Sequence, residues 1–370
     1  MTPVEAYDVL FFFGAGASAP FGIPTMKQFV IDFEDLLSRK ATDDERTTYS
    51  KIKTSLEKEL GKPVDLEAIF SVIDGVINYS PERVGLLALY SCFALTKPTD
   101  HIVAVCKVLK KRFQDFVREK CAIPEDSFEK IGTVYHDFFN RFALEFPAAN
   151  TLQTRRPYAW NDRWVLFTTN YDVCLEYYWH EVAGVRIDTG FRFDADRNAT
   201  FLDSGKLLRE DIGMQLFKLH GSVDWFVDAK TNDVMEVEVE RGRSHMGRKF
   251  KREMMIYPIS EKELYLDPYI SMLLRLNREL QKKSVWVVIG YSFNDPIVRE
   301  IFLRKSSPEK HLVFVHPQAE QICQDRLQDA QLNRSLMQKK FGEDTYRQVN
   351  HQIMHTLTSN PSGLDKTPIP

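Results

Sequence analysis

The feature that most limits the fold is an apolar run near the amino terminus that stops at a glycine-rich turn. The run spans Tyr7–Phe13 and is apolar throughout from Val9 onward, and Gly14–Ser18 reads Gly-Ala-Gly-Ala-Ser. Such a run is typical of a strand buried on both faces of a parallel sheet. A glycine turn directly after it can bring backbone N–H groups close to a phosphate. A tight strand-to-helix turn without a ligand explains the same residues equally well.

Further apolar runs alternate with segments of helical periodicity. The other strands predicted for the same sheet are Trp164–Thr168, Leu216–Leu219, Val285–Ile289 and His311–Val315. A helix is predicted to begin near Asp295-Pro296, because the first turn of a helix tolerates proline. The alternation predicts an α/β fold with a Rossmann-like, doubly wound parallel sheet. Ligands bind such sheets outside the carboxyl ends of the strands.

The periodicity also predicts how the chain is divided. From Met26 to about Pro147 the apolar residues recur at helical spacing. We therefore expect a Rossmann-like core at residues 1–30 and 160–320, a large helical insertion at 31–159, and a C-terminal helical segment and tail at 321–370. Residues 234–240 alternate apolar and acidic side chains and 249–255 carry basic ones, which predicts that these two segments pair as an antiparallel hairpin.

Composition excludes several classes of protein. A hydrophobic content of 44% and a net charge of -3 indicate a globular protein that is not drawn as a whole to nucleic acid or lipid. Five cysteines without C-x-x-C spacing favour a reducing compartment over a disulfide scaffold, and we expect no metal. Glu5 and Asp8 precede the apolar residues Val9–Phe13, where a signal peptide needs positive charge. Val84–Leu95 is too short to span a bilayer, so we predict that it forms a buried helix. We expect a cytoplasmic protein without membrane contact.

Polar clusters follow three further predicted strands. In Thr168–Asp172, Asn170 can donate and accept at once, which suits orienting a ribose hydroxyl or a water. His220, followed by a glycine, can serve as a general base near neutral pH. Ser292 and Asn294 can bond ribose hydroxyls, with Asp295 as a helix N-cap. The alternative for each cluster is a purely structural turn, core histidine or cap.

In this order, the clusters resemble the sirtuin-like (silent information regulator) family. That family shows Gly-Ala-Gly-x-Ser, Gly-Ile-Pro, Thr-x-Asn-x-Asp, His-Gly and Gly-x-Ser. The matching segments here are Gly14–Ser18, Gly22–Pro24, Thr168–Asp172, His220-Gly221 and Gly290–Ser292. The resemblance implies NAD as the substrate and catalytic roles for Asn170 and His220. It also implies that NAD is bound by Gly14, Ala15, Gly16, Ser18, Thr169, Asp172, Gly290, Ser292 and Asn294.

Two departures from the pattern refine the expected activity. No cysteine lies between Cys174 and Cys323, where protein-deacylating sirtuins carry two pairs for structural zinc, and Thr25–Lys27 replaces their Asp-Phe-Arg. Both departures resemble the bacterial antiviral-defence branch, whose members hydrolyse NAD⁺ to nicotinamide and ADP-ribose. The resemblance therefore implies an NAD⁺ glycohydrolase (NADase) that acts in antiphage defence by depleting NAD⁺. The alternatives are an NAD-dependent protein deacylase and a non-enzymatic sensor of NAD or ADP-ribose that regulates a partner.

An enzyme that depletes NAD⁺ must stay silent until it is needed. We therefore expect control by homo-oligomerisation or by a separate subunit. The resemblance to short members of the defence branch implies a HerA-type ATPase as that subunit. The basic segment at 241–252 is expected to be a solvated hairpin, with a nucleic-acid or partner contact as the alternative.

Overall fold

The computed structural model describes residues 9–78 except 62, 99–145, 164–185, 187–209, 213–237, 250–255 and 267–342, and a few positions between 345 and 355. The chain divides into two compact units. The sheet unit comprises Met1–Ile23, Ile123–Met255 and Tyr265–Pro370, and the helical unit comprises Pro24–Ala122 and Ile256–Leu264. We describe each unit by itself.

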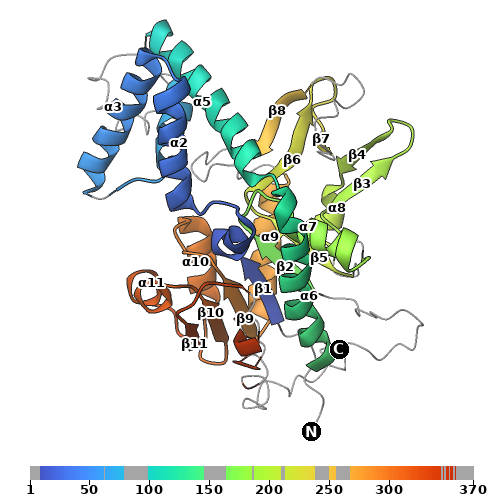
Figure 1. The fold of residues 1–370 in the computed structure, drawn as a ribbon. Coiled ribbons are helices and arrows are strands. Elements are labelled where there is room, and N and C mark those ends of the chain that lie inside the picture. Colours follow the sequence, from blue (N-terminus) through green and yellow to red (C-terminus); the bar gives the residue numbers. More distant parts are fainter. Residues whose placement is uncertain are drawn as a thin grey trace. The chain divides into compact units, whose positions relative to one another are not determined.

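A six-stranded parallel sheet forms the centre of the sheet unit (Figure 1). Its order is β11-β10-β9-β1-β2-β5, which is the 3-2-1-4-5-6 order of a doubly wound Rossmann sheet. The strands are β1 (Val9–Phe13), β2 (Val165–Thr168), β5 (Gln215–Lys218), β9 (Val285–Ile289), β10 (His311–Val315) and β11 (Asn333–Met337). The predicted fold class is confirmed, and the predicted bounds of β9 and β10 match the structure.

The alternating side chains of β1 explain why this strand is apolar throughout. Phe11 packs edge-on against Phe138 of α6 (Phe128–Glu145), with ring centroids 5.8 Å apart. Phe12 points to the other face and meets Phe302 of α10 (Pro296–Lys305) at 5.4 Å. All five residues of β1 are buried. Helices on both faces therefore require an apolar residue at every position of this strand.

Strand register brings the carboxyl ends of four strands into one row. Ile289 of β9 pairs with Phe13 of β1, Phe13 pairs with Thr168 of β2, and Thr168 pairs with Lys218 of β5. The polar segments singled out in the sequence begin in this row, at Thr168, or one or two residues beyond it. The order reversal of the doubly wound sheet falls between β1 and β9.

Short helices and longer ones connect and cover the strands of this unit. They are α1 (Ala15–Ser18), η2 (Ala19–Phe21), η4 (Glu125–Ser127), α7 (Cys174–Tyr177), the π-helical turn η6 (Tyr178–Val182), α8 (Ser204–Leu207), α9 (Tyr269–Lys282) and α11 (Ala319–Arg326). Helix α10 begins at Pro296 with Asp295 as its N-cap, as predicted.

A second sheet corrects the predicted hairpin. Its order is β3-β4-β7-β6-β8, with β3 (Phe191–Asp194), β4 (Ala199–Leu202), β7 (Val234–Glu236), β6 (Gly221–Asp228) and β8 (Phe250–Met255). The segments expected to pair directly, β7 and β8, lie on opposite sides of β6 and each pairs with it. Strand β6 thus lies between β7 and β8, and its alternate residues Val223, Trp225 and Val227 are buried. Most of the basic segment at 241–252 lies outside the described residues.

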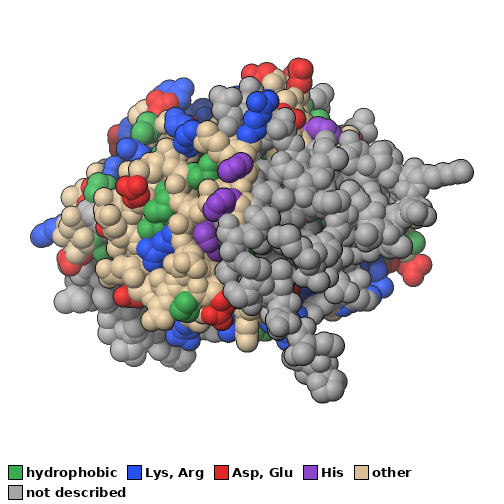
Figure 2. Space-filling view, turned by 90° about the horizontal axis from the view of Figure 1, so that it is seen from below, with side chains coloured by type: hydrophobic (Ala, Val, Ile, Leu, Met, Phe, Trp, Pro, Cys, Tyr) green, Lys and Arg blue, Asp and Glu red, His purple; other side chains and the backbone are tan. Residues whose placement is uncertain are grey.

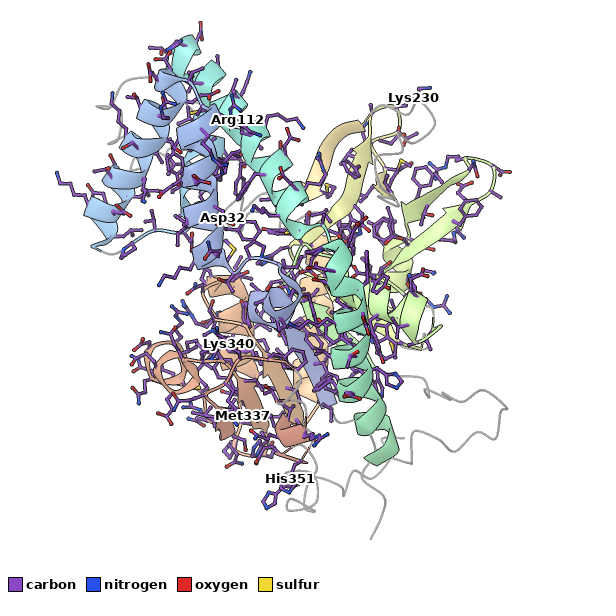
Figure 3. All side chains as sticks on the ribbon, viewed as in Figure 1. Asp32, Arg112, Lys230, Met337, Lys340 and His351 are labelled. Carbon is purple, nitrogen blue, oxygen red and sulfur yellow. The ribbon has the colours of Figure 1, made fainter. Side chains whose placement is uncertain are left out.

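The helical unit contains α2 (Met26–Lys40), α3 (Asp43–Leu60), α4 (Leu66–Ile77) and α5 (Asp100–Cys121). The ring of Phe33 on α2 lies 5.6 Å from Phe70 of α4 and 5.5 Å from Phe113 of α5, which makes an aromatic core. Arg112 on α5, labelled in Figure 3, places its Nε 3.1 Å from Glu45 Oε2 of α3. None of the helices in the described part of the chain is long and apolar enough to cross a membrane. The predicted apolar helix at Val84–Leu95 lies outside the described residues.

The structure differs from the predicted division of the chain in two places, the end of the helical insertion and the C-terminal segment. Helix α6, which we placed in the helical insertion, belongs to the sheet unit because its aromatic face packs on β1. Residues Asn333–Met337, expected to be helical, form edge strand β11 beside β10.

Figure 2 shows a face with histidine side chains gathered in a row. His311 lies at the amino end of β10, and burial together with the charge of His355 lowers the pKa of its imidazole.

Candidate functional site

The glycine turn after β1 touches the loop after β9 at the point where the strand order reverses. Gly14 N donates to Ile289 O at 2.8 Å, and Gly16 N donates to Gly290 O at 2.9 Å. A Cβ on Gly16 would lie 2.7 Å from Gly290 Cα, and Gly290 itself has φ of +66°. Glycine is required here because two backbones meet. The N–H groups of Gly14 and Gly16 are thus bonded within the protein.

Asn170 is anchored to this turn by both protons of its amide. Its Nδ2 donates to Gly14 O at 3.0 Å and to Ser18 Oγ at 2.9 Å, and its backbone N donates to Thr168 Oγ1 at 3.0 Å. The side chain is half-buried. Among the residues that the structure describes, none donates to Asn170 Oδ1, so this oxygen remains an acceptor.

The His220 imidazole is held by the carboxylate of Asp295, which lies in the loop after β9. Its Nε2 lies 2.9 Å from Asp295 Oδ2, and both side chains are almost fully buried. Burial alone would raise the pKa of Asp295. The hydrogen bond from His220, the charge that its ring carries when protonated, and the backbone amides of Val298 and Ile297 together outweigh burial and hold the Asp295 pKa below its usual value. Asp295 is therefore an ionised partner for His220 at neutral pH.

Asn170 and His220 occupy equivalent places on neighbouring strands. Thr168 and Lys218 are a registered pair, and each of the two candidate residues follows its strand by two positions. The ring of Tyr171, next to Asn170, lies 6.4 Å from the ring of His220. Gly221 with φ of +83° turns the chain directly after His220, where a Cβ would lie 2.0 Å from Met254 O. The fold thus brings both residues to one edge of the sheet.

The other residues that we predicted to bind NAD differ in burial and in their hydrogen bonds. Asp172 is buried and accepts from Cys174 N at 3.1 Å, and Thr169 N donates to Phe13 O at 3.2 Å. Ser18 is buried and bonded to Asn170. Ser292 is half-buried and Asn294 is exposed in the loop after β9. Ala15 opens α1 and is half-buried.

Two residues of the site were missed or underestimated in the sequence. Asp295 was expected only as a helix cap, although it also bonds His220. Lys218 was not singled out, yet it is fully buried at the end of β5 and donates to Asp172 O at 2.6 Å and to Ser222 Oγ at 2.7 Å. A lysine between the apolar residues Phe217 and Leu219 was the available signal, because buried lysines need specific partners.

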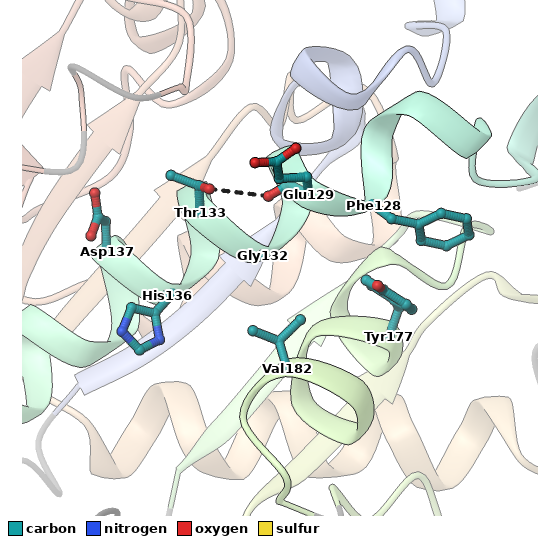
Figure 4. A pocket seen from close by; sticks show the side chains of 8 residues that line it. All are labelled: Phe128, Glu129, Gly132, Thr133, His136, Asp137, Tyr177 and Val182. Carbon is teal, nitrogen blue, oxygen red and sulfur yellow. Dashed lines mark hydrogen bonds between the residues drawn. The ribbon is translucent and has the colours of Figure 1, made fainter.

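A separate hollow of about 460 Å³ lies beside α6 (Figure 4). Phe128 and Tyr177, with ring centroids 4.7 Å apart, form its apolar end, and Val182 faces Gly132. Its lining shares no residue with the strand-end row. In the described part of the chain, no group of three or more His, Cys, Asp or Glu side chains is arranged to hold a metal ion.

Comparison with known proteins identifies one family model. Residues 165–340 match the model of the SIR2-like domain. No curated protein matches the chain. Solved structures that resemble it include a Sir2 homologue in complex with NAD, at 15% identity and a TM-score of 0.43 over 96% of this chain and 93% of that one. Another is a Sir2 protein bound to a propionylated peptide, at 12% identity and a TM-score of 0.36 over 93% and 92%. The SIR2-like match therefore extends from β2 to β11 of the sheet unit.

Proposed function

We propose that the protein is an NAD⁺ hydrolase that cleaves the bond between nicotinamide and ribose. The observation that carries the proposal is the pair of acceptors at the strand-end row. Asn170 donates both amide protons to protein atoms, and its Oδ1 is left as an acceptor. His220 Nε2 is bonded to Asp295, and its Nδ1 is left as an acceptor. Neither remaining atom is among the fully buried ones that lack a partner. Two acceptors in reach of solvent fit a ligand that donates hydroxyl protons, such as ribose and water.

The proposed reaction needs no covalent bond between the protein and the substrate. The glycosidic carbon of NAD⁺ carries a cationic leaving group, so the bond electrons depart with nicotinamide and leave an oxocarbenium-like ribose. Water then adds to that carbon and loses a proton. We propose that Asn170 orients a ribose hydroxyl or the water through Oδ1, and that His220 takes the proton through Nδ1.

The remaining site residues belong to the proposal through the sirtuin-like resemblance. The turn at Gly14–Ser18 lies at the strand-order reversal, where dinucleotides bind doubly wound sheets. We propose that the pyrophosphate lies along this turn and that Ser292 and Asn294 contact ribose. Because the N–H groups of Gly14 and Gly16 are bonded to Ile289 O at the end of β9 and to Gly290 O, other groups of the turn would have to supply the phosphate donors.

The proposed setting is antiphage defence, in which depletion of NAD⁺ stops an infected cell. This part of the proposal rests on the departures from the deacylase pattern described above. It includes control by a homo-oligomer or by a HerA-type ATPase subunit in the cytoplasm. Phage plaques should form less readily on bacteria that express the wild-type chain with such a subunit, and cellular NAD⁺ should fall after infection.

The direct test is incubation of the purified full chain with NAD⁺, with and without the ATPase, followed by separation of products. We expect nicotinamide and ADP-ribose in equal amounts. His220→Ala and Asn170→Ala should each lower turnover by about 10² or more. The matched controls are His101→Ala, an exposed histidine that also faces a carboxylate, and Asn333→Ala, an exposed amide bonded to Pro308 O. Both should keep wild-type turnover.

Other outcomes would replace the proposal. Release of O-acetyl-ADP-ribose from an acetylated peptide would identify a deacylase. Binding of NAD⁺ or ADP-ribose without any turnover, with or without the ATPase, would identify a sensor. Wild-type turnover in either site variant would show that the assigned residues are wrong.

A further inference from the structure

One carboxylate links two of the strand-end loops. Asp295 Oδ1 accepts from Ile297 N at 2.8 Å and Val298 N at 3.1 Å, which caps α10, while Oδ2 lies 2.9 Å from His220 Nε2. A cap needs one acceptor oxygen, and Ser or Asn supplies it as well as Asp does. The cap therefore explains Oδ1 alone. Oδ2 has another partner, which comes from a different strand end.

The loop that carries Asp295 is held in an unusual backbone conformation. Phe293 has φ of +55°, which is rare for a bulky residue, and its side chain is fully buried. The Phe293 ring packs against Tyr291, Phe302 and Phe314, with centroids 4.9, 5.2 and 5.5 Å away. Such strain persists only where the surroundings impose it, and it gathers at functional sites. The packing thus fixes the direction in which Asp295 points.

The bond between Asp295 and His220 determines where the imidazole proton lies. An ionised carboxylate only accepts, so the proton in this bond is on Nε2. The neutral ring then has its lone pair on Nδ1. None of the described residues forms a hydrogen bond with Nδ1, which leaves that atom for a ligand.

We propose that Asp295 is a positioning residue for the reaction, and that it holds His220 in the Nε2–H tautomer with Nδ1 as the base. When Nδ1 takes a proton from a hydroxyl or water, the ring becomes an imidazolium and Asp295 stabilises its charge. Asp295 touches no substrate and acts only through His220. This inference rests on the NAD⁺ hydrolase activity proposed above.

Two substitutions separate this role from the helix cap. Asp295→Asn keeps a cap oxygen but turns an N–H toward His220 Nε2, which favours the opposite tautomer. Asp295→Ser keeps a cap oxygen and leaves Nε2 without its partner. Each should lower kcat by about 10² to 10⁴ and change KM less than about threefold. Asp65→Asn is the matched control, because Asp65 caps α4 with one oxygen that accepts from Ala68 N. It should keep the wild-type kcat.

A measurement on the wild-type protein tests the tautomer without relying on activity. Nitrogen-15 NMR of histidine-labelled protein, with the His220 signal assigned by its loss in His220→Gln, should show a proton on Nε2 and none on Nδ1 at pH 8. In Asp295→Asn the proton should move to Nδ1. A wild-type proton on Nδ1 overturns the inference, and so does a folded Asp295→Asn enzyme that keeps kcat within threefold. If the wild type cleaves no NAD⁺, the proposed function fails, but NMR still decides the tautomer.

Discussion

Lys218 Nζ lies 2.7 Å from Glu176 Oε1, and the Lys218 side chain is completely buried. The same ammonium donates to Asp172 O and Ser222 Oγ. Burial opposes its charge, but the carboxylates of Glu176, Asp224 and Asp172 outweigh burial and raise the pKa of Lys218. This one cation therefore ties the segment that carries Asn170 to the strand end that leads into His220.

Replacement of Lys218 by Met should destabilise the protein strongly. It would remove the partner of Glu176 and leave an unpaired carboxylate in the interior, which costs about 3–5 kcal/mol. We expect that loss in the free energy of unfolding, measured by urea denaturation at pH 7. The double variant Lys218→Met with Glu176→Gln should recover part of it, because the unpaired charge is gone.

The matched control is an exposed ion pair of similar geometry. Arg304 Nε lies 2.7 Å from Glu300 Oε1 on α10, and both side chains are at least half exposed. Arg304→Met should change the unfolding free energy by less than about 1 kcal/mol. Equal losses in the Lys218 and Arg304 variants would contradict the role we assign to burial.

The raised pKa of Glu236 leads us to predict that the stability of the protein depends on pH. Burial, followed by the charges of Asp224 and Glu176, raises its pKa to about 8, although Thr189 Oγ1 donates to its carboxylate. The folded state therefore holds this proton more tightly than the unfolded state. Stability should be highest below the unfolded pKa and should decline, by up to about 1.4 kcal/mol per pH unit, as pH rises toward 8.

Glu236→Gln should remove this part of the pH dependence, because the amide mimics the protonated acid. Thermal unfolding between pH 5 and pH 9 should give similar midpoints for wild type and variant at pH 5 and a higher midpoint for the variant at pH 9. Glu300→Gln, at an exposed position, serves as control and should follow the wild type. Parallel curves for Glu236→Gln and wild type would exclude the raised pKa.

Replacement of Ser18 should lower activity less than replacement of Asn170 or His220. Its hydroxyl accepts one of the two Asn170 amide protons at 2.9 Å, so Ser18→Ala would leave Gly14 O as the one acceptor of the Asn170 side-chain amide among the described residues. We expect about a tenfold loss of NAD⁺ turnover from the looser amide. Ser38→Ala, which removes an exposed bond to Asp35 O, should have no effect. A larger loss in Ser38→Ala than in Ser18→Ala would contradict this assignment.

The central sheet could be predicted because its strands are buried on both faces. Strands such as Val285–Ile289 need an apolar residue at every position, and a continuous apolar run is easy to recognise. Strand β11 gives no such signal, because Asn333–Met337 is only partly buried at the sheet edge. Strand β6 was missed since Ser222 and Asp224 interrupt its apolar residues.

The site could be predicted only as far as strand ends define it. Asn170 and His220 follow registered strands, so topology alone brings them to one edge. The contact between His220 and Asp295 joins positions 75 residues apart and depends on the left-handed backbone of Phe293. No local pattern contains that conformation. The bond of Gly16 N to Gly290 O is likewise a result of tertiary packing.

That packing leads to the last prediction, which concerns Gly16→Ala. The new Cβ would lie 2.7 Å from Gly290 Cα and 3.1 Å from Gly290 O, and backbone atoms have no rotamer with which to move aside. The two loops must separate, which should cost about 1–3 kcal/mol of unfolding free energy. The separation would also displace the turn that anchors Asn170, so NAD⁺ turnover should fall even well below the melting temperature.

Gly132→Ala is the matched control within the same unit. Its new Cβ would meet Val182 Cγ2 at 3.6 Å, an ordinary contact, and the residue lies inside helix α6. Alanine is favoured over glycine in a helix by up to about 1 kcal/mol, so this variant should be as stable as wild type or more so. Thermal unfolding and NAD⁺ turnover of both variants at one temperature decide the matter. If Gly16→Ala matches Gly132→Ala in both measurements, the contact between the two loops does not hold the turn.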